Sequence, residues 1–91
     1  MIQAFVLISA EPAQIASLGR DLASLDGVVE VHSVAGSGVS LLATLSVNTH
    51  EEIATIVTEG IAQQPGITDT QTLISFRCYN DKDLDTIFDM E

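Results

Sequence analysis

The side chains in this sequence that suit catalysis or metal binding are few and far apart. His32 and His50 stand in different predicted elements, and neither has a cysteine or a paired carboxylate at metal-ligand spacing. Cys78 is the single cysteine, and its acidic sequence neighbours disfavour the thiolate that a nucleophile requires. We therefore predict no catalytic residue, no metal site and no cofactor.

The features that favour a binding site lie in the stretch Leu25 to Leu42, around a predicted hairpin of the strands Val28 to Val34 and Val39 to Val47. Its turn, Ala35-Gly36-Ser37-Gly38, contains two glycines, which permit positive φ and let a small molecule approach the backbone closely. The turn leads into a strand rather than a helix, so it does not match a phosphate-binding loop. We place a candidate binding site at this turn. The alternative is that the turn only sets the register of the hairpin.

Composition narrows the class of protein further. The 91 residues make one domain, and 13 acids against three bases give a net charge of −10. Such a chain repels nucleic acid and anionic membranes. No apolar run approaches the ~20 residues that span a bilayer, and the N-terminus lacks the basic region of a signal peptide. With one cysteine, these features predict a cytoplasmic protein without an internal disulfide.

The first half of the chain predicts a strand, a helix and a second strand. Ile2 to Ala10 is apolar on both faces, which is typical of a central strand. Glu11-Pro12 opens a helix, and Asp26-Gly27 ends it. The strand that follows is Val28 to Val34. The apolar stripe of the helix consists of Ile15, Leu18, Leu22 and Leu25.

The second half repeats this pattern, beginning with a strand at Val39 to Val47. Thr49 and Glu52 match a capping box that starts a second helix, which stops at Pro65-Gly66. A last strand spans Thr68 to Arg77. The order β-α-β-β-α-β with right-handed crossovers predicts an α+β, ferredoxin-like fold with a four-stranded antiparallel sheet and both helices on one face.

Because two helices cover only one face of such a sheet, the apolar residues of the other face need a partner surface. Stacking the sheets of two copies provides one, so we predict a dimer. The predicted interface residues are Phe5, Leu7, Leu42 and Leu73.

Residues 1–77 form the predicted domain, and residues 78–91 form an acidic tail. Leu84, Ile87 and Phe88 have helical spacing, which favours a short docked helix; a solvated end is the alternative. The acidic run 81–85 resembles the start of a calcium loop but lacks its glycine and its late glutamate.

The segments VVEVHSVAGSGVSLLATLSV and QPGITDTQTLISF, in this order and spacing, resemble the effector-binding domain of Lrp/AsnC transcription regulators. The resemblance covers Ala4 to about Phe76. It implies face-to-face sheet dimers, often in a ring of four dimers, and a small effector, commonly an amino acid, bound between dimers. Carried over by position, the ligand-binding residues are Val34, Ala35, Gly36, Ser37, Gly38, Val39, Thr70 and Thr72.

Two departures from the family pattern are visible. Ser37 and Val39 stand where family turns usually carry acids, so the ammonium group of an amino acid lacks its charged partner there. The helix-turn-helix that precedes this domain in the family is missing, so the chain is a stand-alone member or a fragment. It would modulate transcription through full-length partners, without direct contact to nucleic acid.

Two other classes of function remain open. A small peptide-binding chaperone of the same fold would hold a signal peptide at a sheet edge or face, and would stay a monomer. A small dimeric ferredoxin-like enzyme would need a buried histidine or acid in a cavity, for which His32 is the available residue. The mass of the protein in solution distinguishes these alternatives.

Overall fold

The computed structural model describes residues 1–81, and the element order is the predicted β-α-β-β-α-β. A single 3-10 turn (Pro12–Gln14) precedes the first helix, and a π-helical segment (Ile56–Ile61) extends the second. The main elements are β1 (Ile2–Ala10), α1 (Ile15–Ala23), β2 (Val28–Ser33), β3 (Leu41–Val47), α2 (His50–Thr55) and β4 (Ile67–Ile74).

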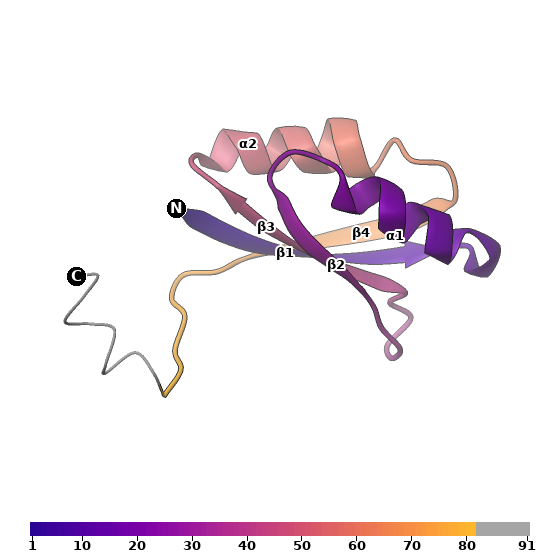
Figure 1. The fold of residues 1–91 in the computed structure, drawn as a ribbon, viewed down its shortest axis with the longest axis horizontal. Helices are drawn as coiled ribbons and strands as arrows, with labels where there is room; N and C mark the ends of the chain where they lie inside the picture. The colour runs from indigo at the N-terminus through magenta and orange to yellow at the C-terminus, as the bar shows by residue number, and fades with distance from the viewer. Residues whose placement is uncertain (82–91) are drawn as a thin grey trace.

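The four strands form one antiparallel sheet in the order β2-β3-β1-β4. Both helices lie on the same face of this sheet, and the other face carries no element of the described chain (Figure 1). The ferredoxin-like fold and the central position of β1 are therefore confirmed. Among the described residues, no helix is long and apolar enough to cross a membrane.

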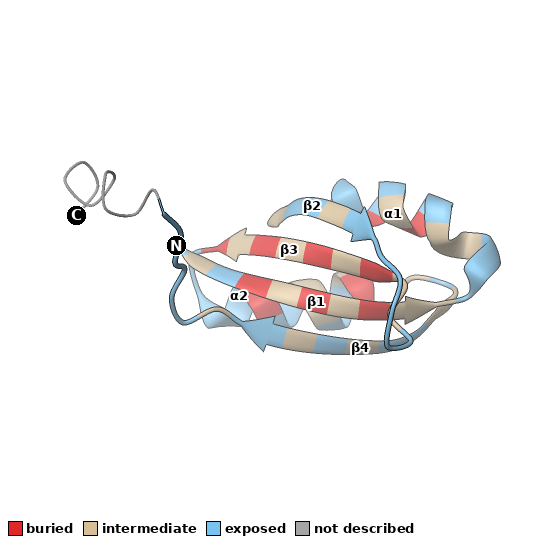
Figure 2. Cartoon of the chain, turned by 90° about the horizontal axis from the view of Figure 1, so that it is seen from below, coloured by how far each residue is buried: buried red, intermediate tan, exposed pale blue. Residues whose placement is uncertain are grey.

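The core lies between the sheet and the helices and is aliphatic. β1 and β3 alternate strictly, with every second residue buried beneath the helices, as Figure 2 shows in red along both strands. No polar or charged side chain of the described chain is buried. The largest fully buried side chains are Val6, Ile8, Leu22, Leu41, Leu45 and Ile61.

The strand boundaries and one strand face differ from the sequence prediction. β3 begins at Leu41 rather than Val39, and β4 ends at Ile74 rather than Arg77. In β2, the register shifts between Val28 and Glu30, which pair with Leu45 and Thr44. This β-bulge adds one residue to β2. Val28 consequently joins the helix-covered face, whereas strict alternation predicts that it lies on the opposite face.

The start of α2 follows the predicted capping box with one change. The Thr49 hydroxyl accepts a hydrogen bond from the Glu52 N–H at 3.1 Å. The Glu52 carboxylate accepts from the Asn48 N–H at 2.8 Å, one residue before the N-cap. Two backbone donors near the helix start are satisfied in this way. The predicted tail helix at Leu84, Ile87 and Phe88 lies outside the described residues.

Removal of the cap hydroxyl should destabilise the fold measurably. We expect Thr49→Ala to lower the free energy of unfolding by about 1 kcal/mol, because the Glu52 N–H loses its acceptor. Thr58→Ala is the matched control in the same helical segment. The Thr58 hydroxyl donates to the Ala54 carbonyl, a bond that adds little to helix stability. Urea denaturation followed by circular dichroism measures both, and equal losses would contradict the capping role.

Candidate functional site

The helix-free face of the sheet presents four large apolar side chains side by side. Phe5 pairs directly with Leu73, and Leu7 pairs directly with Leu42. Direct partners in an antiparallel ladder share a face, and β1 lies between β3 and β4, so the four side chains make one continuous surface. We call Phe5, Leu7, Leu42 and Leu73 the open-face patch. The structure thus brings all four predicted interface residues together.

The turn between β2 and β3 bends toward this same open face. The Ser9 hydroxyl donates to the Gly38 carbonyl at 2.8 Å, and the Ser40 N–H donates to the Ile8 carbonyl at 2.8 Å. Figure 2 shows the turn crossing the end of β1. Ser37 has φ 56° between Gly36 and Gly38, which also have positive φ, so three successive residues are left-handed. The turn is exposed and held to β1 at its base.

Thr70 and Thr72 lie on the opposite side of the sheet from the turn. They pair with Ile8 and Val6, whose side chains are buried beneath the helices. Both threonines are half-buried on the edge strand β4. Within one copy, the structure therefore does not bring the two predicted parts of the ligand site together.

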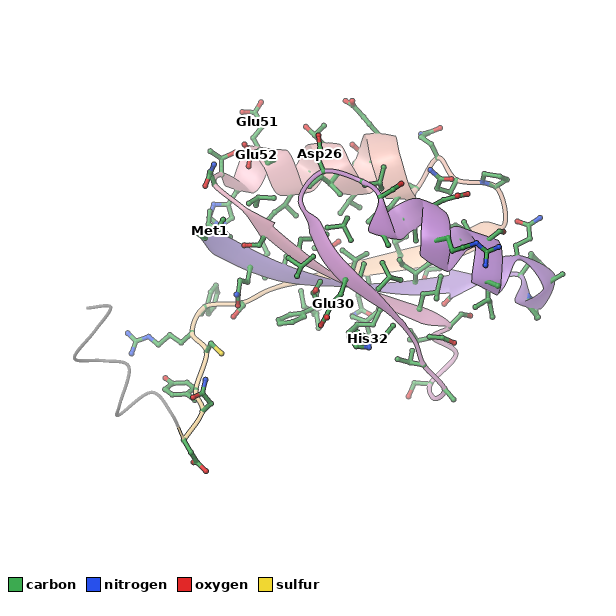
Figure 3. The ribbon with its side chains drawn as sticks, in the orientation of Figure 1. Met1, Asp26, Glu30, His32, Glu51 and Glu52 are labelled. Atoms are coloured by element: carbon green, nitrogen blue, oxygen red, sulfur yellow. The ribbon has the colours of Figure 1, made fainter. Side chains whose placement is uncertain are left out.

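A groove of about 660 Å³ opens at the end of the sheet that is distant from the turn. Three carboxylates line it: Asp26 comes from the turn before β2, and Glu51 and Glu52 come from the first turn of α2, as labelled in Figure 3. Val47 and Ile56 supply apolar lining. Such a groove repels anions. Sequence reasoning missed it because Asp26 and Glu51 are distant in sequence and meet only through the fold.

A second groove, of about 560 Å³, runs between α1 and the edge strand β2. Small side chains of α1 line it, with Ala16, Gly19 and Ala23 facing Val31 and Leu41. Arg20 is the one charged lining residue.

His32 forms an exposed side-chain contact with Glu30 that sequence reasoning missed. Its Nε2 lies 3.0 Å from the Glu30 Oε2, and more than half of each side chain is exposed. The signal was the i, i+2 spacing, which places both side chains on the same face of β2. Neither residue lines either groove. His32 is therefore not the buried histidine in a cavity that the enzyme alternative would need. Across residues 1–81, no cluster of three metal-ligating side chains occurs.

The fold and the patch define a class of protein: a small ferredoxin-like domain with one uncovered sheet face. The Lrp/AsnC ligand binding domain model matches residues 3–84, and the chain belongs to this family. No curated protein sequence matches the chain. The family is typically non-catalytic.

Solved structures agree with this assignment. The chain is 40% identical to TTHA0845 from Thermus thermophilus, with a TM-score of 0.82, 88% of this chain covered and 99% of that one. It resembles FFRP-DM1 at 25% identity and a TM-score of 0.76, covering 82% and 99%. Both relatives have nearly the length of this domain.

Two more distant structures share the fold alone. One is the transcriptional regulator NMB0573 in complex with L-Met, from Neisseria meningitidis, at 17% identity and a TM-score of 0.72, covering 84% of this chain and 50% of that one. The other is the siroheme decarboxylase NirDL, an enzyme, at 23% identity and a TM-score of 0.74, covering 84% and 26%. The fold is therefore compatible with both regulation and catalysis.

We expect the hydrogen bond from the Ser9 hydroxyl to hold the turn against β1. We expect Ser9→Ala to speed hydrogen exchange at the Val39 and Ser40 amides about fivefold, because one hydrogen bond of about 1 kcal/mol is lost. Ser17→Ala removes a comparable side-chain bond to the Gln14 carbonyl on exposed α1 and serves as the control. Unchanged exchange in Ser9→Ala would show that the backbone bonds alone fix the turn.

Proposed function

We propose that this domain is a regulatory module that self-associates through the open-face patch and binds a small amino-acid-like effector beside the hairpin turn. The observation that carries the proposal is the uncovered apolar patch at the centre of the sheet, in a chain of the Lrp/AsnC ligand-binding family. A sheet face with such a patch is stable when a second apolar surface excludes water from it.

The physical argument for self-association is the size of the domain. A domain of this length buries a smaller share of its unfolded surface than a larger domain does, so its stability margin is narrow. Each large side chain of the patch gains about 1.5–3 kcal/mol when it passes from full exposure to full burial. Phe5, Leu7 and Leu42 are already half-buried and Leu73 is 48% exposed, so the gain for each is smaller. In a symmetric dimer, each gain occurs in both copies. The charge of −10 on each copy opposes association and is screened by salt.

The argument for an effector between copies is the separation of the two predicted site halves. The turn bends to the open-face side, and Thr70 and Thr72 face the helix side. Their hydroxyls would bind the carboxylate or amine of an effector that the turn of another copy also contacts. The bound L-Met of NMB0573 supports an amino acid as the chemical class. The effector would therefore be sensed through assembly between dimers, with a ring of four dimers as the upper size.

The route to transcription would be indirect. An acidic domain of this kind repels the DNA backbone, so its output would pass through co-assembly with full-length Lrp/AsnC regulators in the cytoplasm. No membrane contact and no cofactor enter the proposal. The peptide-binding chaperone is the competing function, and the groove between α1 and β2 would be its site.

The assembly is tested by the mass of the protein in solution. We expect light scattering to show a dimer or a larger multiple of it, and Leu73→Glu to shift the protein toward monomer, because a charge would be buried in the patch. Ala54→Glu adds the same charge on the exposed side of α2 and should leave the mass unchanged. A wild-type monomer at high concentration would instead favour the chaperone.

Effector binding is tested by thermal melting with each of the twenty amino acids. A ligand at 100 times its Kd adds about 2.7 kcal/mol of apparent stability, which raises the Tm by roughly 10 °C or more. We expect Thr70→Val and Thr72→Val to remove this shift without lowering the Tm of the free protein. Thr68→Val changes an exposed threonine of the same strand and is the control. The absence of a shift with every amino acid would refute this class of effector.

A further inference from the structure

The chain leaves the sheet after β4 as an exposed arm. The Ser75 N–H still donates to the Gln3 carbonyl at 2.9 Å, and residues 76–81, which we call the arm, then turn away from the domain. Figure 1 shows the arm on the side of the sheet opposite the helices. Phe76 is 95% exposed and Tyr79 is 78% exposed. Two aromatic side chains in water on the open-face side indicate a surface that another chain covers.

The exposed large apolar residues of the described chain fall at the two edges of the sheet. One group lies along β4 and the arm and consists of Leu73, Ile74, Phe76 and Tyr79, with Met1 at the same end of the sheet. The other group, Val29 and Val34, lies at β2 and the residue after it. In a symmetric dimer, a patch on one copy can contact a different patch on the other, and the contact occurs twice. The two groups are thus suited to cover each other.

The start of β2 is at the same end of the sheet as the arm. Ala4 pairs with Ile74 and with Leu45, and Leu45 pairs with Val28, so one row joins the end of β4 to the start of β2. A two-fold axis that runs along the strands between two stacked sheets brings β4 of each copy over β2 of the other. The arm then emerges next to the partner's Val29, which is 63% exposed at the bulge.

β2 also offers an incoming segment available backbone groups and a complementary charge. It is an edge strand, so its outer backbone groups are available to an added segment. Its exposed carboxylate, Glu30, is complementary to the arm's Arg77. Arg20 and Arg77 are the two arginines of the chain, against 13 acids, so Arg77 sits on the arm where it would offset repulsion between two acidic copies.

We infer that the two copies of the dimer exchange their arms: each arm crosses to the second copy and lies along the start of its β2, with Phe76 against Val29 and Arg77 beside Glu30. This inference rests on the proposed function, because it requires the sheets to stack through the open-face patch. It adds a second contact that determines which of the possible two-fold arrangements forms.

Cys78 makes the exchange directly testable, because the one thiol of the chain lies in the arm. In the Val29→Cys variant of the 91-residue chain, mild oxidation should join Cys78 to the introduced cysteine of the other copy. A non-reducing gel would then show a band of twice the chain mass within minutes. Ala54→Cys, with its second thiol exposed on α2, and the wild type should form this band at least tenfold more slowly.

The outcomes separate this inference from the proposed function. A dimer by light scattering in which Val29→Cys cross-links no faster than Ala54→Cys refutes arm exchange and leaves the stacked sheets in place. A wild-type monomer refutes both.

Phe76→Ser provides an independent measurement. Because Phe76 is almost fully exposed in one copy, its loss should leave the melting curve of the dilute protein unchanged. We expect the dimer dissociation constant to rise at least tenfold. Adding Val29→Ser should cause little further loss, since the two residues would share one contact. An unchanged dissociation constant in Phe76→Ser would overturn the inference.

Discussion

The structure depends on a strand that is apolar on both of its faces. β1 lies between β3 and β4 and turns Ala4, Val6 and Ile8 to the helices. Its other face carries Phe5 and Leu7, over which no element of the described chain lies. Burial of apolar area is the main source of stability in a domain of this size. One sheet therefore contains both the core of the single copy and the surface through which we propose that copies associate.

This arrangement explains why the proposed effector site is divided. Ser9 ties the turn to β1 on the open side, and the pleat of β4 directs Thr70 and Thr72 to the helix side. In the proposed function, the two halves would therefore be joined around a small molecule only between copies. Sensing and assembly are then one event in the proposed function, because a ligand that bridges copies stabilises the assembled state by its binding free energy.

The charge distribution favours one surface over the others for the proposed contact between copies. Each copy carries −10, and the acid-lined groove at Asp26, Glu51 and Glu52 concentrates part of that charge at one end of the sheet. The open face is by contrast poor in charge: Glu30 lies beside His32 at one edge, Asp69 lies at the other edge, and apolar side chains occupy the centre. In the proposed dimer, two copies would therefore meet where repulsion is weakest, and Arg77 on the arm would offset what remains.

The sequence alone predicted the fold, the central strand and the four residues of the open-face patch. Local signals sufficed there: a strand apolar on both faces, helical periodicity, the Thr49 cap, and a two-residue alternation that assigns Phe5 and Leu7 to one face. The family was also predictable, because several short motifs that are weak alone become specific when they occur in a fixed order and spacing. The match of the family model over residues 3–84 confirms the prediction. The ligand-binding role of the turn stays a prediction.

The tertiary structure decided the features that depend on residues distant in sequence. The bulge in β2 moved Val28 to the covered face, because an extra residue in one strand is visible only against its partner. The hydrogen bond from Ser9 to the turn joins residues 29 positions apart in the sequence. Three further features arise from how the strands pair and where they end. They are the acid-lined groove, the position of the turn and Thr70 on opposite faces of the sheet, and the exposure of Phe76 to water. Sequence patterns report which face a residue takes on its own strand, and only the packed sheet determines what that face meets.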